Sequence, residues 1–194
     1  MASAPSDRPR VLVAGVGNIF LGDDAFGVEV VQRLARRQLP DGVRVVDFGI
    51  RGLDLAYALL DPYEAVVMVD ATPRGGRPGT LYVLEPGPAS GLPAAEAVAL
   101  IEPHNLEPAR VLRLVEALGG QVRRLLVVGC EPAPPSDAGD GLAEMSAAVR
   151  AAVDEAVLLV ESLIARLLGA ASVGEENTIP EKEVPTCHPL DKTD

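Results

Sequence analysis

The sequence has few aromatic residues and only two cysteines, and both shortages limit what the protein can do. Aromatic residues make up 3% of the 194 residues, so the chain has little material for the stacking surfaces that bind single-stranded nucleic acids. Cys130 and Cys187 are far apart and lack the spacing of a zinc knuckle. We expect no disulfide framework, a buried Cys130 within its apolar run, and a reducing compartment.

Positive charge is also scarce. The chain has 17 Lys and Arg residues against 28 Asp and Glu residues, which gives a formal net charge of −11. Such a surface repels phosphate backbones and anionic membranes, so we expect neither nucleic acid nor membrane as a partner. No apolar run reaches the roughly 20 residues that a membrane-spanning helix needs. The opening MASAPSDRPR lacks the apolar core of a secretory signal, and we expect a cytoplasmic protein.

Hydrophobic residues make up 48% of the chain and fall into alternating strand-like and helix-like segments. This alternation predicts parallel strands joined by helical crossovers. Only seven residues, TPRGGRP (72–78), separate the third and fourth strands, too few for a crossover helix, so the fourth strand should run antiparallel. The predicted strands are 11–17, 43–49, 65–71, 79–85 and 122–130, and the predicted helices are 23–39, 52–60, 105–118 and 144–168.

These elements predict one domain, from residue 10 to residue 168. Its expected fold is a three-layer α/β/α sandwich around a five-stranded, mostly parallel sheet with one antiparallel strand. Residues 1–9 are small and polar and should form a flexible leader. Residues 169–194 are polar, acidic and without periodicity, which predicts a disordered tail.

Acidic residues and a histidine follow several of the predicted strands. In an open α/β sheet, ligands bind at the carboxyl ends of the strands, where the strand order reverses. Asp24, Asp70 and His104 come from three segments and would together offer two carboxylates and an imidazole, which suit a divalent metal with open positions. Each also has a plain structural explanation. Asp24, or its neighbour Asp23, could cap the first helix, Asp70 could bind a turn, and His104 could start a helix. The other polar candidates are Asn18, Asp23, Asp47 and Glu131.

The segment GVGNIF (15–20) begins like the dinucleotide fingerprint G-x-G-x-x-G. Phe20 replaces the third glycine, and we expect its ring to obstruct the close packing of helix and strand. Asp23 and Asp24 would also repel a phosphate at the helix start. Asp47, after the second strand, still favours a nucleotide ribose, so a nucleotide-binding oxidoreductase is kept as the weaker alternative.

The segment VLVAGVGNIFLGDDAFGVEVVQRL (11–34) resembles the opening of the hydrogenase maturation endopeptidases. It has a strand, a G-x-G-N turn, and an acidic pair followed by a glycine before the first helix. Further matches follow in the same order along the chain: VVDFG (45–49), VVMVDA (66–71), Pro103-His104, VVGCEP (127–132) and GLAEMSAAVRAAVDEAV (141–157).

The resemblance implies an endopeptidase that removes the C-terminal extension of a nickel–iron hydrogenase large-subunit precursor after nickel insertion. It implies Asp24, Asp70 and His104 as the metal-binding and catalytic residues. We expect them to engage nickel carried by the precursor, and hydrolysis to be centred on that metal.

Several points stay open at this level. Asp23 and Asp47 are candidates for a general base by position alone. A non-enzymatic nickel-sensing chaperone would use the same three ligands without cutting. We expect the chain to be a monomer.

Overall fold

The computed structural model describes residues 10–86, 108–134 and 144–170. Five strands form one sheet in the order β2-β1-β3-β5-β4. Neighbouring strands run parallel except β4 and β5, so the predicted antiparallel fourth strand is confirmed. The strands are β1 (Val11–Val16), β2 (Val43–Gly49), β3 (Ala65–Ala71), β4 (Leu81–Leu84) and β5 (Leu125–Cys130).

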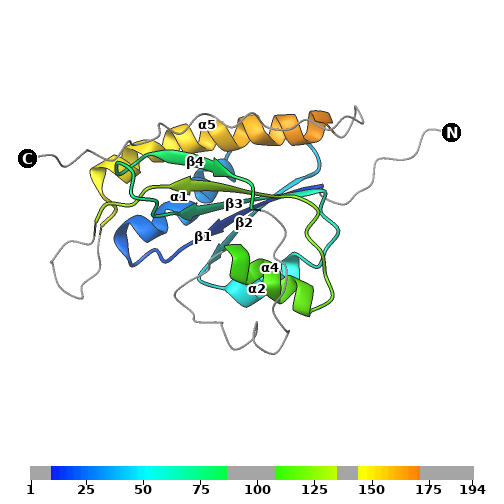
Figure 1. The fold of residues 1–194 in the computed structure, drawn as a ribbon. Helices are drawn as coiled ribbons and strands as arrows, with labels where there is room; N and C mark the ends of the chain where they lie inside the picture. The colour runs from blue at the N-terminus through cyan, green and yellow to red at the C-terminus, as the bar shows by residue number, and fades with distance from the viewer. Residues whose placement is uncertain (1–9, 87–107, 135–143, 171–194) are drawn as a thin grey trace, which may run out of the picture.

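Helices cover both faces of the sheet, and the predicted three-layer sandwich is confirmed (Figure 1). α1 and α5 pack on one face, and α2 and α4 pack on the other. The helices are the short 3-10 helix η1 (Gly22–Ala25), α1 (Phe26–Leu34), α2 (Gly52–Ala58), α4 (Pro108–Ala117) and α5 (Ala147–Ala170).

The three central strands are buried on both faces, which explains their continuous apolar sequences. In β3, Val67 and Val69 contribute to the core under α1 and α5, while Val66 and Met68 contribute to the core under α2 and α4. Cys130 lies in the first of these cores with a free thiol, as its apolar surroundings predicted. The sheet is therefore held between two mainly aliphatic layers, and its strand ends are free to carry polar residues.

The first helix differs from its prediction at both ends. Asp23 and Asp24 were expected to cap it, but neither carboxylate makes a cap hydrogen bond, and residues 22–25 form η1 instead. Both carboxylates bind backbone N–H groups elsewhere in the fold, as described below. The helix ends at Leu34 and not at residue 39. The N–H groups of Arg36 and Arg37 donate to the carbonyl oxygens three residues back, so the chain leaves the helix in a tighter turn.

Smaller differences occur at other boundaries. α5 begins at Ala147 because the hydroxyl of Ser146 accepts a hydrogen bond from the backbone N–H of Val149, which caps the helix. It continues to Ala170, past the predicted start of the tail. β5 begins at Leu125, three residues later than predicted, since only residues 125–130 pair with β3.

Some predicted features lie outside the described residues, namely the leader 1–9, His104 and the tail beyond residue 170. Within the described part of the chain, each helix is too short or too polar to cross a lipid bilayer.

Candidate active site

Asp24 and Asp70 meet at the point where the strand order reverses. β1 pairs with β2 on one side and with β3 on the other, so the crossovers after β1 and after β2 pass over opposite faces of the sheet. Asp24 lies in η1, the first helix after β1, and Asp70 is the penultimate residue of β3. This is the edge at which open α/β sheets bind their ligands.

Two glycines allow η1 and α1 to sit against the strand ends. A side chain at Gly27 would overlap the carbonyl oxygens of Val16 and Val69, so the first turn of α1 lies directly on β1 and β3. Gly17 has a φ of +126°, and a Cβ there would overlap the carbonyl oxygen of Asp24. The glycine pattern of the opening motif is therefore a packing requirement that brings Asp24 to the end of β3.

Phe20 does not obstruct this packing, contrary to the expectation from the sequence. Its side chain is 57% exposed in the loop after β1. Gly27, seven residues later, provides the close approach of helix and strand that the third glycine of a dinucleotide fingerprint would provide. The negative charge of the two carboxylates in η1 still disfavours binding of a phosphate at this place.

Burial raises the cost of ionising both Asp24 and Asp70, and the charge of Asp24 raises it further for Asp70. The pKa of Asp70 is raised to about 8, first by burial and then by the charge of Asp24, while a backbone hydrogen bond from Ala71 acts in the opposite direction. Burial also raises the pKa of Asp24, against a 2.6 Å hydrogen bond from the backbone N–H of Asn18. We call these two residues the carboxylate pair. At neutral pH such a pair needs a proton or a cation between its members.

The carboxylate pair offers two oxygen ligands to a cation. Within the described ranges, no group of three His, Cys, Asp or Glu side chains lies close enough to hold a metal ion. The predicted third ligand, His104, lies outside those ranges. Two hard oxygen donors are compatible with a divalent first-row metal that takes its remaining ligands from elsewhere.

Asp23 has a different role from its neighbour Asp24. Its two carboxylate oxygens accept hydrogen bonds from the backbone N–H groups of Ala133, at 2.8 Å, and Ser146, at 2.6 Å. These bonds hold the segment after β5 and the start of α5 against η1. Because both oxygens are engaged in this way, Asp23 fits a structural role better than that of a general base.

Among the described residues, the one charged side chain that is buried belongs to Glu131, which is 5% exposed. Its carboxylate accepts hydrogen bonds from the backbone N–H groups of Arg74, at 2.8 Å, and Gly75, at 3.0 Å, and from the hydroxyl of Tyr82, at 2.8 Å. Burial acts to raise the pKa of Glu131, but these hydrogen bonds outweigh it and the pKa lies below its ordinary value.

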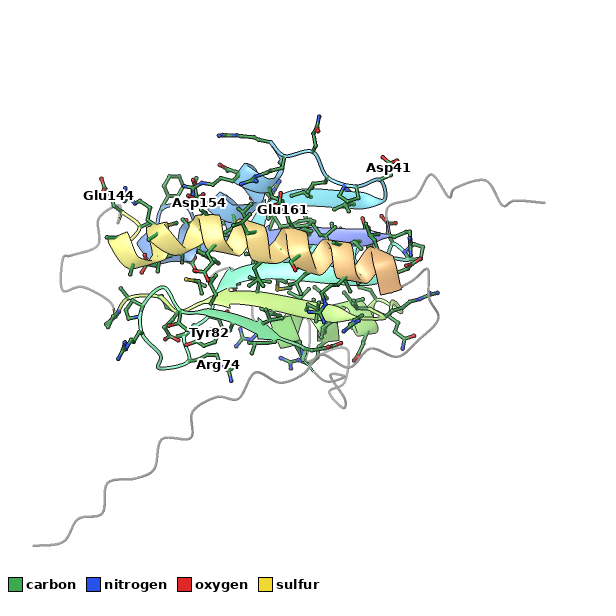
Figure 2. The ribbon with its side chains drawn as sticks, turned by 90° about the horizontal axis from the view of Figure 1, so that it is seen from above. Asp41, Arg74, Tyr82, Glu144, Asp154 and Glu161 are labelled. Atoms are coloured by element: carbon green, nitrogen blue, oxygen red, sulfur yellow. The ribbon has the colours of Figure 1, made fainter. Side chains whose placement is uncertain are left out.

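Glu131 thereby fixes the loop 72–80, which directly follows the strand that carries Asp70. Figure 2 shows Arg74 and Tyr82 side by side at this loop, and the Arg74 guanidinium carbon lies 5.8 Å from the centre of the Tyr82 ring. Sequence reasoning gave Glu131 no role. The available signal was an acid directly after a buried strand, where a charge is stable only if it is well hydrogen-bonded.

Asp47 lies on the other face of the sheet from Asp70. It pairs in register with Gly15, which also pairs with Val69, and Val69 faces the core under α1 and α5. Side chains alternate along a strand, so Asp70 faces the opposite side. The Asp47 carboxylate accepts a hydrogen bond of 3.2 Å from the side chain of Gln32 in α1. This placement does not favour Asp47 as a general base for chemistry at the carboxylate pair.

Comparisons with known proteins agree with this fold. A family model described as hydrogenase maturation protease, HycI, matches residues 28–163. The hydrogenase expression/formation protein HupD of Rhizobium leguminosarum bv. viciae is 32% identical over 173 residues, covering 86% of this chain and 84% of HupD. The hydrogenase 2 maturation protease of Escherichia coli K12 is 33% identical over 124 residues, covering 63% of this chain and 73% of the relative.

Solved structures give the same result. The structure of the hydrogenase maturating endopeptidase HybD from Escherichia coli matches with a TM-score of 0.64 and 30% identity, covering 81% of this chain and 93% of HybD. A maturation protease HycI from Thermococcus kodakarensis, at 24% identity and a TM-score of 0.57, has the same fold.

Proposed function

The chain belongs to the hydrogenase maturation protease family, and from that premise we propose that it removes the C-terminal extension of a nickel-loaded hydrogenase large-subunit precursor. Membership in a protease family makes the chain a hydrolase. The dependence on nickel and the assignment of Asp24, Asp70 and His104 as its ligands are parts of the proposal.

The observation that carries the proposal is the carboxylate pair at the switch point of the sheet. Burial and mutual repulsion make two ionised carboxylates costly there, and a divalent cation would relieve that cost. Nickel inserted in the precursor would arrive as part of the substrate. A precursor without nickel would meet Asp70 with its proton still bound, and it would bring no cation to replace that proton. This difference supports a check on nickel insertion before cleavage.

The chain's own residues have defined parts in this proposal. The N–H of Asn18 holds one oxygen of Asp24. Asp70, with a pKa of about 8, keeps its proton at neutral pH until a cation approaches and then releases it on binding. His104 would supply a nitrogen ligand. The metal would polarise the scissile carbonyl or activate a water for attack.

The test is a mass measurement on precursor incubated with this protein. Nickel-loaded precursor should lose the mass of its C-terminal extension, and nickel-free precursor should stay intact. Unchanged mass with retained binding would favour a nickel-sensing chaperone over a protease. Equal cleavage of loaded and nickel-free precursor would contradict the nickel dependence and leave the proteolytic activity standing.

A further inference from the structure

Three consecutive apolar side chains project from the loop between β1 and η1. Ile19 is 56% exposed, Phe20 57% and Leu21 54%. Residues 15–22 contain no charged side chain, although charged residues make up 23% of the whole sequence. Single exposed apolar residues are ordinary, but a contiguous group beside a candidate active site indicates a binding surface.

The loop that carries these side chains is held in one shape by hydrogen bonds. The side-chain oxygen of Asn18 accepts a hydrogen bond from the N–H of Phe20 at 3.0 Å. The backbone carbonyl oxygen of Asn18 accepts one from the N–H of Leu21, also at 3.0 Å. The N–H of Asp24 donates to the carbonyl oxygen of Leu21 at 3.2 Å. The exposed side chains are therefore presented on an ordered backbone, which lowers the entropy lost on binding.

Two further exposed apolar side chains follow β2, namely Ile50 in the loop after the strand and Leu53 in the first turn of α2. The N–H of Gly17 donates to the carbonyl oxygen of Gly49 at 3.0 Å, which joins the two loops. Ile50 is 45% exposed and Leu53 46% exposed. Between them, the guanidinium of Arg51 turns back to the carbonyl oxygens of Asp47 and Phe48. We call Ile19, Phe20, Leu21, Ile50 and Leu53 the apolar rim.

We propose that the apolar rim binds an uncharged, apolar stretch of the precursor polypeptide next to the scissile bond. This inference rests on the proposed function. The backbone N–H of Asn18, where the rim begins, holds the Asp24 carboxylate at 2.6 Å. A peptide bound along residues 19–21 would thus lie directly beside the carboxylate pair.

The size of the rim also favours a peptide segment over a second copy of the chain. The five side chains are each about half exposed. They offer roughly a few hundred Å² together, since even an aromatic side chain buries only roughly 150–250 Å². A stable protein–protein interface buries roughly 800 Å² on each partner. The segment that carries Ile19, Phe20 and Leu21 runs on into η1, which holds Asp24. The expected occupant is therefore the part of the substrate that reaches the carboxylate pair.

The test compares Phe20→Ser and Ile19→Ser with Leu158→Ser, using the full chain and nickel-loaded precursor. Leu158 is a matched control because it is 58% exposed and lies in α5, about 18 Å along the helix from Ser146. We expect each rim variant to raise KM about tenfold or more, the loss expected when a large apolar side chain is no longer buried on binding. The value of kcat should change little, and Leu158→Ser should match the wild type.

A second measurement separates this inference from the proposed function. Binding of the precursor is followed by fluorescence anisotropy, independently of cutting. If the wild type binds without cutting and Phe20→Ser weakens binding, the rim inference stands and the proteolytic function fails. If the wild type cuts and both rim variants keep its KM, the rim inference is overturned.

A third outcome would assign the apolar rim to an interface between two copies of the chain. Light scattering that shows a wild-type dimer dissociated by Phe20→Ser would assign the rim to self-association and overturn its assignment to substrate. Thermal melting of each variant checks its fold, and because the side chains are exposed, the melting temperature should stay that of the wild type.

Discussion

Four acidic side chains at the carboxyl edge of the sheet form two groups that differ in their hydrogen bonds. Asp23 and Glu131 accept hydrogen bonds from the backbone N–H groups of distant segments, and Glu131 also accepts one from a tyrosine hydroxyl. Asp24 and Asp70 face each other with few donors, and the pKa of each is raised.

The comparison shows that the supply of donors, more than burial alone, decides what a carboxylate at this edge can do. Glu131 is 5% exposed, yet its pKa lies below the ordinary value because several N–H and O–H groups surround it. Asp70 has a pKa of about 8 because burial and the charge of Asp24 outweigh its hydrogen bond. The well-bonded acids hold loops, and the poorly bonded acids are available for chemistry.

The largest expected effect is on processing. Asp70→Asn and His104→Ala should each reduce cleavage of nickel-loaded precursor by about 100-fold or more, since losing a ligand costs at least as much as losing the residue that supports one. Asp47→Asn is the matched control and should keep most of the activity. Precursor cleavage followed by mass spectrometry provides the measurement. An Asp70→Asn variant with normal activity would contradict a role of the carboxylate pair in the reaction.

The next effect is on stability. Glu131→Ala should lower the free energy of unfolding by about 3 kcal/mol, because it leaves the N–H groups of Arg74 and Gly75 and the hydroxyl of Tyr82 without their acceptor. Tyr82→Phe removes one of these hydrogen bonds and should cost less. Urea denaturation measures both variants. Equal stability of Glu131→Ala and the wild type would show that this carboxylate does not hold the loop 72–80.

The pH dependence of stability tests the raised pKa of Asp70 directly. Between about pH 4 and about pH 8, folded Asp70 keeps a proton that the unfolded chain has released. The free energy of unfolding should therefore fall as the pH rises through this range, by at most about 1.4 kcal/mol per pH unit from this group. Asparagine does not titrate, so Asp70→Asn should lose less stability over the same range. Parallel curves for the two proteins in urea denaturation would contradict the raised pKa.

The smallest effect is expected at Asp23. Asp23→Ala should lower the free energy of unfolding by about 1 kcal/mol, because the side chain is half-buried and water can reach part of the freed N–H groups. Asp23→Asn keeps one acceptor and should cost less. Thermal melting gives the stability, and processing should fall only modestly. A loss of processing as severe as that of Asp70→Asn would show that Asp23 takes part in the reaction and does not only hold the fold.

The sequence predicted the sheet well because the relevant signals are local. Apolar runs such as 65–71 indicate strands buried on both faces, and the short link TPRGGRP predicted the antiparallel strand. The rule that ligands lie at strand ends brought Asp24 and Asp70 into one list, and the structure places them together. His104 lies outside the described residues, so its place in the site stays a prediction.

The sequence alone determined which acidic residues follow buried strands, and therefore which carboxylates share the carboxyl edge of the sheet. Only the tertiary structure decided how those carboxylates differ. Asp23 was expected to cap a helix or act as a base, but its partners Ala133 and Ser146 are 110 and 123 residues away in the chain. Glu131 takes its donors from residues 49 to 57 positions away. Strand periodicity acts between near neighbours, whereas the hydrogen-bond donors that fix a carboxylate's charge come from segments that only folding brings together.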